Sequence, residues 1–302
     1  MAKDERDEII RTGGQLITLD TLERPQLGDF KVSDSLAILI HGFTSHGKYL
    51  IELGKDLKRW GIQAFLFNYN SYRGIHVAAD VLKSLLLTYN SNTGGEISQK
   101  RLFLIAHSMG GLVARKFALD PEVKGLVRGI VMLGTPNKGA FEGSRILEYF
   151  VYYGEYLSKR IMPDARVPAC VSGQQLIKAD NPGGVPFIDQ LNEDWKKHND
   201  PPPVMTISGG KRRLDLFSNP IKNGWANRQI QKAIGDRSND GLVAEDSVNI
   251  SAHSIGERYR HLSSYADHPD LNHTNLIENQ FIAGRIVNWI KERQKPATAS
   301  NQ

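Results

Sequence analysis

Short apolar segments alternate with helical segments along much of the chain, and this alternation restricts the fold more than any other feature. Five runs are typical of strands that are buried on both faces of a sheet: 36–40 (LAILI), 62–69, 101–106 (RLFLIA), 128–134 and 204–208. Residues 77–89 show the apolar spacing of a helix, and residues 110–119 are expected to form a helix that ends before Pro121. The pattern predicts an α/β fold with a mostly parallel sheet flanked by helices.

The length of 302 residues fits one large α/β domain. We expect this domain to span residues 31–295, between an N-terminal extension over 1–30 and a C-terminal tail over 296–302.

An insertion at about 140–203 interrupts the alternation, because no convincing strand occurs there. Apolar side chains with helical spacing run through it, at Ile146, Phe150, Tyr153 and Leu157. We expect a helical cap or lid over a site at the strand ends, where open α/β sheets bind ligands. The same stripe also fits a helix that packs on the domain core, and the two interpretations are compatible.

The charge of the chain does not point to nucleic acid. There are 38 Lys and Arg residues against 33 Asp and Glu residues, a formal net charge of +5. The basic clusters at 196–197, 211–213 and 291–295 are far apart and mixed with acids, and no nucleic-acid motif accompanies them. At most, this charge would favour peripheral contact with an anionic lipid interface.

Cellular location is inferred from features that the sequence lacks. The single cysteine, Cys170, excludes an intrachain disulfide. The first ten residues are mostly charged, unlike a secretory signal, and no apolar run approaches the roughly 20 residues of a transmembrane helix. We therefore expect a soluble, cytoplasmic protein.

The motif Ala106-His107-Ser108-Met109-Gly110-Gly111 lies between a buried strand and a helix. A nucleophilic serine needs a sharp strand-to-helix turn, and small residues two positions before and after it allow that turn. Alanine replaces the commoner glycine at the first of these positions. The helix dipole and the Met109 N–H group would both stabilise an oxyanion. This context predicts that Ser108 is a nucleophile.

Four further segments accompany this motif: His41-Gly42-Phe43, Gly134-Thr135-Pro136-Asn137-Lys138-Gly139, Asp240-Gly241-Leu242-Val243 and Leu271-Asn272-His273-Thr274-Asn275. Together they resemble the lipase and esterase branch of the α/β-hydrolase superfamily, over roughly residues 36–290. The resemblance implies an α/β-hydrolase fold with a Ser-His-Asp triad.

A serine hydroxyl needs an imidazole to accept its proton, and the imidazole needs a carboxylate to orient it. The fold that the chain resembles has the order Ser, Asp or Glu, His, and Ser108, Asp240 and His273 satisfy it. We prefer Asp240 to Asp236 because Gly-Leu-Val follows only Asp240. Three other histidines compete for the base: His253, His261 and His268. We prefer His273, at the expected start of a terminal helix, because it matches the pattern of the family that the chain resembles.

An oxyanion hole needs two N–H donors that converge. Met109 is expected to supply one, and Phe43, in the loop after the first core strand, the other. Gly42 permits a close approach of that loop to a ligand.

The same loop allows a rival interpretation. Residues 42–48 (GFTSHGK) match seven positions of the phosphate-binding pattern G-x-x-x-x-G-K-[ST]. The eighth position is Tyr49, which lacks the compact hydroxyl that contacts magnesium, and no acidic residue ends a neighbouring strand. We therefore do not favour a nucleotide-hydrolysing enzyme.

No cofactor or required metal is expected. Some lipases similar to this chain hold a structural calcium ion, with an aspartate ligand two residues after the catalytic histidine. This position is Asn275 here, a weaker calcium ligand. The histidines and Cys170 do not have zinc-ligand spacing.

These observations predict a serine hydrolase of carboxylic esters that forms an acyl-enzyme intermediate. The apolar insertion favours acyl esters or lipids over very small esters. A phospholipid or thioester acyl hydrolase with the same triad remains an alternative, as does a non-catalytic binding module on a hydrolase fold.

Overall fold

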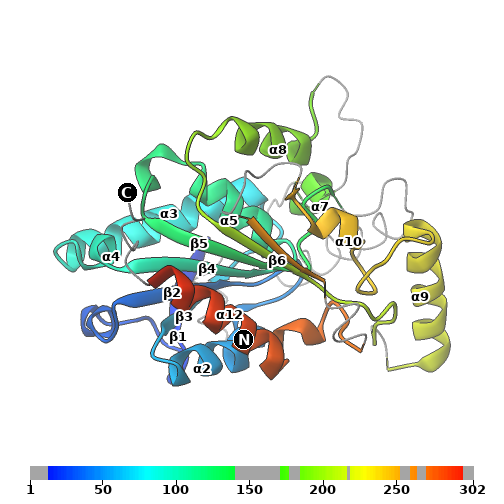
Figure 1. Cartoon of the computed structure of the whole chain (residues 1–302), viewed down its shortest axis with the longest axis horizontal. Coiled ribbons are helices and arrows are strands. Elements are labelled where there is room, and N and C mark those ends of the chain that lie inside the picture. Colours follow the sequence, from blue (N-terminus) through cyan, green and yellow to red (C-terminus); the bar gives the residue numbers. More distant parts are fainter. Residues whose placement is uncertain are drawn as a thin grey trace, which may run out of the picture.

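One sheet of seven strands forms the centre of the protein (Figure 1). The structure is a computed structural model, and it describes residues 13–139, 171–176, 184–215, 218–251, 259–263 and 270–294. The strand order is β1-β3-β2-β4-β5-β6-β7. All neighbouring strands are parallel except β1, which is antiparallel to β3. The mostly parallel α/β sheet expected from the sequence is confirmed.

The elements have the following bounds. The strands are β1 (Gly14–Thr18), β2 (Ser35–Ile40), β3 (Gln63–Tyr69), β4 (Arg101–His107), β5 (Val127–Leu133), β6 (Val204–Ser208) and β7 (Tyr259–Ser263). The α-helices in the described ranges are α2 (Ile51–Arg59), α3 (Ile75–Asn92), α4 (Glu96–Gln99), α5 (Gly110–Ala118), α7 (Val171–Leu176), α8 (Phe187–Lys197), α9 (Pro220–Ile234), α10 (Glu245–Val248) and α12 (Gln280–Gln294). Short 3₁₀ turns are η1 (Leu27–Lys31), η2 (Gly47–Leu50), η3 (Pro121–Val123) and η6 (Asn275–Ile277).

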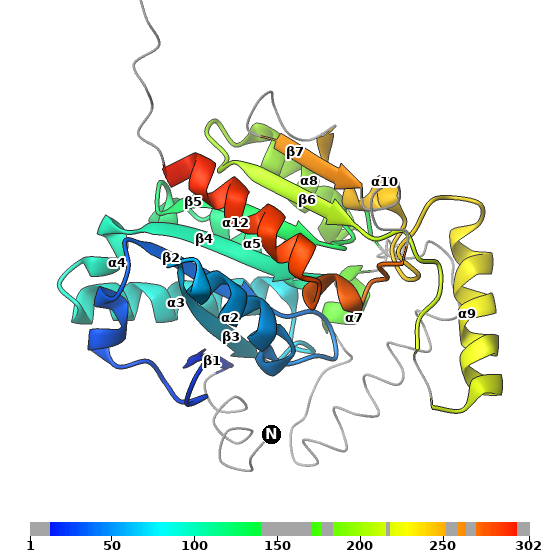
Figure 2. The ribbon, with the colours of Figure 1, turned by 60° about the horizontal axis from the view of Figure 1, so that its bottom comes forward.

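Helices cover both faces of the sheet, which explains the uninterrupted apolar runs. In β2, Leu36, Ile38 and Ile40 pack in a core with residues of α3, α5 and α8. Ala37 and Leu39 point to the opposite face and pack with residues of α2 and α12. Figure 2 shows α2 and α12 over this second face. Each residue from 36 to 40 is therefore fully buried, and the chain becomes partly exposed only in the loop that follows β2.

The sheet begins earlier in the chain than expected. Residues 14–18, within the range assigned to an extension, form β1 and pair in register with β3. Phe30, on η1, is buried in the main core. The sheet and core thus include residues before the expected domain boundary at residue 31, because the chain from Gly14 onward supplies an edge strand and a core aromatic.

The expected insertion at 140–203 is only partly described. Within it, α8 packs on the core through Ile188, Leu191 and Trp195. The aromatic stripe at 146–157 lies outside the described residues, so the expected cap stays a prediction. None of the helices in the described ranges is long and apolar enough to cross a bilayer.

Candidate active site

Ser108 sits at a strained turn between β4 and α5. Its φ is 54°, in the left-handed region that non-glycine residues rarely adopt, at a cost of about 1–3 kcal/mol. The Ser108 N–H group donates to the Leu133 carbonyl at 2.8 Å, which anchors the turn to β5. A Cβ atom at Gly110 would lie 2.4 Å from the Ile40 carbonyl oxygen, so only glycine allows this approach of α5 to β2. The predicted sharp strand-to-helix turn is present.

The loop after β2 lies against this turn. A Cβ atom at Gly42 would lie 2.8 Å from Cβ of Ser108, so Gly42 lets the two segments touch. Among the described residues, neither the Phe43 N–H group nor the Met109 N–H group donates a hydrogen bond. Met109 directly precedes α5, where amide groups lack helical partners. Both expected oxyanion donors are therefore free to bind a ligand.

Asp240 and His273 form a buried pair. Oδ2 of Asp240 lies 2.8 Å from Nδ1 of His273, and their side chains are 0% and 4% exposed. Oδ1 of Asp240 accepts N–H groups from Leu242 at 3.0 Å and Val243 at 2.7 Å. Gly241 has a φ of 96°, which makes this tight turn possible. The Gly-Leu-Val sequence that singled out Asp240 thus supplies the turn that holds its carboxylate.

His107 braces His273 from the other side. Its Nε2–H group donates to the His273 carbonyl at 2.7 Å, and the ring centroids lie 4.8 Å apart. Burial, and secondarily the nearby His273 ring, lower the pKa of His107 to about 3. His107 is therefore neutral and adds no charge beside His273.

His41 shapes the loop that carries Phe43. The Nδ1–H group of His41 donates to the Gly42 carbonyl at 2.9 Å, while Nε2 accepts the Tyr69 N–H group at 3.3 Å. The Tyr69 hydroxyl donates to the His41 carbonyl at 2.8 Å. Burial lowers the pKa of His41 to about 4, so the ring is neutral. The His-Gly pair is visible in the sequence, but this structural role of the histidine ring is not.

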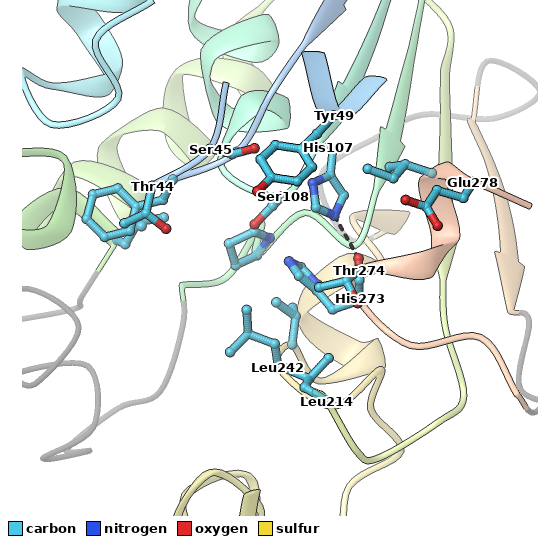
Figure 3. Close-up of a pocket in the computed structure, with 16 residues that line it drawn as sticks. Thr44, Ser45, Tyr49, His107, Ser108, Leu214, Leu242, His273, Thr274 and Glu278 are labelled. Atoms are coloured by element: carbon cyan, nitrogen blue, oxygen red, sulfur yellow. Dashed lines mark hydrogen bonds between the residues drawn. The ribbon is translucent and has the colours of Figure 1, made fainter. Parts of the chain in front are cut away.

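A pocket of about 350 Å³ joins these parts at the carboxyl edge of the sheet (Figure 3). Ser108 and His273 both line it, beside His107 and Gly42. No hydrogen bond joins Oγ of Ser108 to His273 in the described part of the chain, and such contacts often tighten only when substrate binds. Most of the remaining wall is apolar: Phe43, Tyr49, Pro136, Leu176, Leu214, Leu242, Val243 and Ile277.

The competing candidates lie elsewhere or are not described. Asp236 is exposed to solvent. His261 lies on β7, where its ring contacts Thr206 at 2.8 Å and Glu245 at 3.4 Å, and it does not line the pocket. His253 and His268 lie outside the described residues. His273 precedes η6 rather than opening a helix, because α12 starts only at Gln280.

Gly134 is a site residue whose role the sequence did not reveal. It follows β5 with a φ of 58°. A Cβ atom there would lie 2.8 Å from both Oδ2 of Asp240 and Nδ1 of His273. The first position of the Gly-Thr-Pro segment must therefore be glycine, because a side chain would push into the acid–base pair.

A buried arginine stabilises the segment that begins at Gly134. Arg115 on α5 donates to Oδ1 of Asn137 at 3.1 Å and to Oδ1 of Asn192 at 2.9 Å. Nδ2 of Asn192 in turn donates to the Asn137 carbonyl at 3.0 Å. Burial lowers the pKa of Arg115 to about 9, so it stays charged at neutral pH. The sequence gives no clear sign of this network, because a second basic residue, Lys116, follows Arg115 in the helix sequence GGLVARKFA.

The phosphate-loop interpretation finds little support in the loop geometry. A phosphate cradle needs free backbone N–H groups. The Gly47 N–H group donates to Oδ1 of Asn68 at 3.3 Å, and the Thr44 N–H group donates to Oγ of Ser71 at 3.2 Å. This loop lines the pocket of Ser108 instead.

Metal ligands do not cluster in the described part of the chain: no group of three or more His, Cys, Asp or Glu side chains could hold an ion. Oδ1 of Asn275 accepts the Asn272 N–H group at 2.6 Å. The side chain at the position that carries a calcium ligand in some similar lipases is thus part of the turn that contains His273.

Comparison with known proteins identifies the fold. Residues 73–164 match a protein family described as "PGAP1-like alpha/beta domain". The mature lipase BlEst2 of Bacillus licheniformis superposes with a TM-score of 0.58 at 14% identity, over 91% of this chain and 97% of the lipase chain. A soluble variant of the Saccharomyces cerevisiae monoglyceride lipase gives a TM-score of 0.55 at 12% identity, over 94% of each chain.

A third similar structure is the phospholipase PlaB of Legionella pneumophila, with a TM-score of 0.51 and 18% identity. It matches over 72% of this chain and 45% of the phospholipase chain. No curated protein matches the sequence. The chain has the α/β-hydrolase fold, and the resemblance to lipases and esterases is confirmed at the level of that fold.

Proposed function

We propose that this protein is a serine hydrolase of carboxylic esters, with Ser108, His273 and Asp240 as its triad. The buried Asp240–His273 contact of 2.8 Å carries the proposal, because it would orient an imidazole beside a serine on a strained turn in one pocket. A carboxylate on Nδ1 keeps the proton there and leaves Nε2 free to act as a base.

The reaction would proceed in two steps. Oγ of Ser108 attacks the ester carbonyl while Nε2 of His273 takes its proton, and the N–H groups of Phe43 and Met109 bind the resulting oxyanion. The protonated His273 then gives its proton to the leaving alcohol as the acyl-enzyme forms. In the second step His273 activates water, which attacks the acyl carbonyl and releases the acid and Ser108.

The pocket favours an apolar acyl group. Leucine, valine, isoleucine, proline and aromatic side chains form most of its wall, beside a smaller polar group made of Thr44, Ser45, Thr274 and Glu278. Burying a methylene contributes about 0.8 kcal/mol, so acyl chains of some length should bind better than acetate. Phospholipids are a second substrate class, because a phospholipase is among the similar folds. The triad itself does not distinguish esters from thioesters.

A fluorophosphonate probe and a series of p-nitrophenyl esters from acetate to palmitate test the proposal. We expect labelling and hydrolysis by the unaltered protein and neither by Ser108→Ala. Ser45→Ala is the matched control, because Ser45 is a second hydroxyl in the same pocket and should be dispensable. Equal labelling of Ser108→Ala would contradict the proposed nucleophile. No labelling of any form would favour a binding module instead.

A further inference from the structure

Helix α9 exposes apolar side chains on a surface that packing does not explain. Ile221 is 83% exposed and Trp225 is 55% exposed. The side chains on the opposite side of α9 are buried, among them Asn227 and Ile230. We call the exposed residues Ile221, Lys222, Trp225, Arg228 and Lys232 the outer face of α9. Large apolar side chains gathered on an exposed surface commonly mark a binding site.

The outer face is also basic. Besides its two apolar residues it holds three cations and no acid. None of the three cations forms an ion pair within the described ranges. Residues 211–237 carry seven Lys or Arg residues and two Asp residues, an excess equal to the net charge of +5 of the whole chain. The rest of the chain is formally neutral, so the net positive charge lies in the segment that contains α9.

This helix lies at the end of the molecule that carries the pocket. Figures 1 and 2 both show α9 beyond the carboxyl ends of the strands. Leu214, in the pocket wall, is held by α9: its N–H group donates to Oδ1 of Asn227 at 2.8 Å, and its carbonyl accepts Nδ2 of Asn227 at 2.8 Å. A surface that binds the outer face would therefore lie near the pocket.

We propose that the outer face of α9 docks on an anionic lipid surface. Tryptophan and isoleucine suit the boundary between headgroups and acyl chains, and lysine and arginine suit lipid phosphates. A helix with this composition lies in the plane of the interface. Docking would bring the pocket to its substrate, and this use of the surface rests on the proposed ester hydrolysis.

Vesicle flotation of the full chain tests docking. Every protein in this experiment carries Ser108→Ala, so that the vesicle lipids are not hydrolysed during the measurement. We expect binding to vesicles of equal parts phosphatidylcholine and phosphatidylglycerol, and much weaker binding to phosphatidylcholine alone. Replacing Lys222, Arg228 and Lys232 by glutamine should weaken binding to the anionic vesicles about 100-fold. Replacing Ile221 and Trp225 by serine should weaken it at least about tenfold.

Trp60→Ser is the matched control, because Trp60 is 58% exposed on a different surface, after α2. It should bind like the parent. Equal binding to both vesicle types, or unchanged binding of the α9 variants, would overturn the proposal. The proposal would also be overturned if light scattering showed that the parent is a dimer and that the Ile221→Ser, Trp225→Ser variant is a monomer. A second copy of the chain would then cover α9.

Activity measurements separate this proposal from the proposed function. With Ser108 intact, the α9 variants should hydrolyse dissolved p-nitrophenyl esters at the parental rate and vesicle-embedded esters at least about tenfold more slowly. Vesicle binding without any ester hydrolysis would support docking and contradict the hydrolase. Ester hydrolysis with no vesicle binding would support the hydrolase and contradict docking.

Discussion

The carboxylate of Asp240 lies 2.8 Å from Nδ1 of His273, and neither side chain has appreciable contact with solvent. Replacing Asp240 by asparagine keeps the shape and an acceptor for the Leu242 and Val243 N–H groups, but removes the charge that fixes the histidine tautomer. We expect kcat/KM for a p-nitrophenyl ester to fall by about 10⁴. Circular dichroism should show an unchanged fold.

Asp236→Asn is the control for this substitution, because Asp236 lies in the same loop and is exposed. It should retain parental activity. If Asp240→Asn kept activity within about tenfold of the parent, Asp240 would not be the triad acid.

Gly134→Ala should damage the site without touching a reactive group. The new methyl group would lie 2.8 Å from both Oδ2 of Asp240 and Nδ1 of His273, so the two side chains must separate. A displacement of this size is expected to lower kcat by about 10², with a destabilisation of about 1–3 kcal/mol. Steady-state kinetics and urea unfolding measure the two effects.

Gly94→Ala separates this steric effect from backbone strain. Gly94 also has a positive φ, 70°, but a Cβ atom there meets nothing within 4 Å. It should lose about 1 kcal/mol of stability and no activity. Equal losses of kcat in the two variants would refute the steric explanation.

Most of the sheet could be predicted because its strands are buried on both faces. Runs such as LAILI and LFLIA are apolar without interruption, and a strand covered on both sides is the simplest structure for them. β7 does not follow from the sequence, because Tyr259–Ser263 is a short edge strand with polar residues. β1 does not follow from it either, because Gly14–Thr18 is short and pairs at the other edge of the sheet.

The candidate site was predictable where chemistry requires a particular residue type, and less so where packing decides. Ser108 and Asp240 stand in local turns that the neighbouring sequence encodes. The contact of Gly134 with the acid–base pair depends on loops that are more than 100 residues apart in the chain. Single-sequence patterns do not report such tertiary contacts, and the same holds for the bond from His107 to the His273 carbonyl.

Acid should destabilise the protein through two buried histidines. Burial lowers the pKa of His41 to about 4 and that of His107 to about 3, against 6.5 in the unfolded chain. Below pH 6.5 the unfolded state therefore binds more protons, and stability falls as pH falls. Between pH 6 and pH 5 each histidine should remove about 1 kcal/mol from the free energy of unfolding.

Urea unfolding at the two pH values checks this dependence in the parent, His41→Asn and His107→Asn. Each variant should be less stable at pH 7 but should lose less stability on acidification than the parent. A variant with the parental pH dependence would show that the histidine it replaces does not titrate in this way.

Arg115 should matter for stability although no acid pairs with it in the described ranges. Arg115→Met removes two charge-assisted hydrogen bonds and leaves Oδ1 of Asn137 and Oδ1 of Asn192 buried without a donor. Relief from burying a charge offsets part of this loss. We expect a net loss of about 2–3 kcal/mol in urea unfolding, since each unsatisfied acceptor costs about 1–3 kcal/mol. Arg128→Met, at the one exposed position of β5, should cost under about 0.5 kcal/mol, and an equal cost would refute the network.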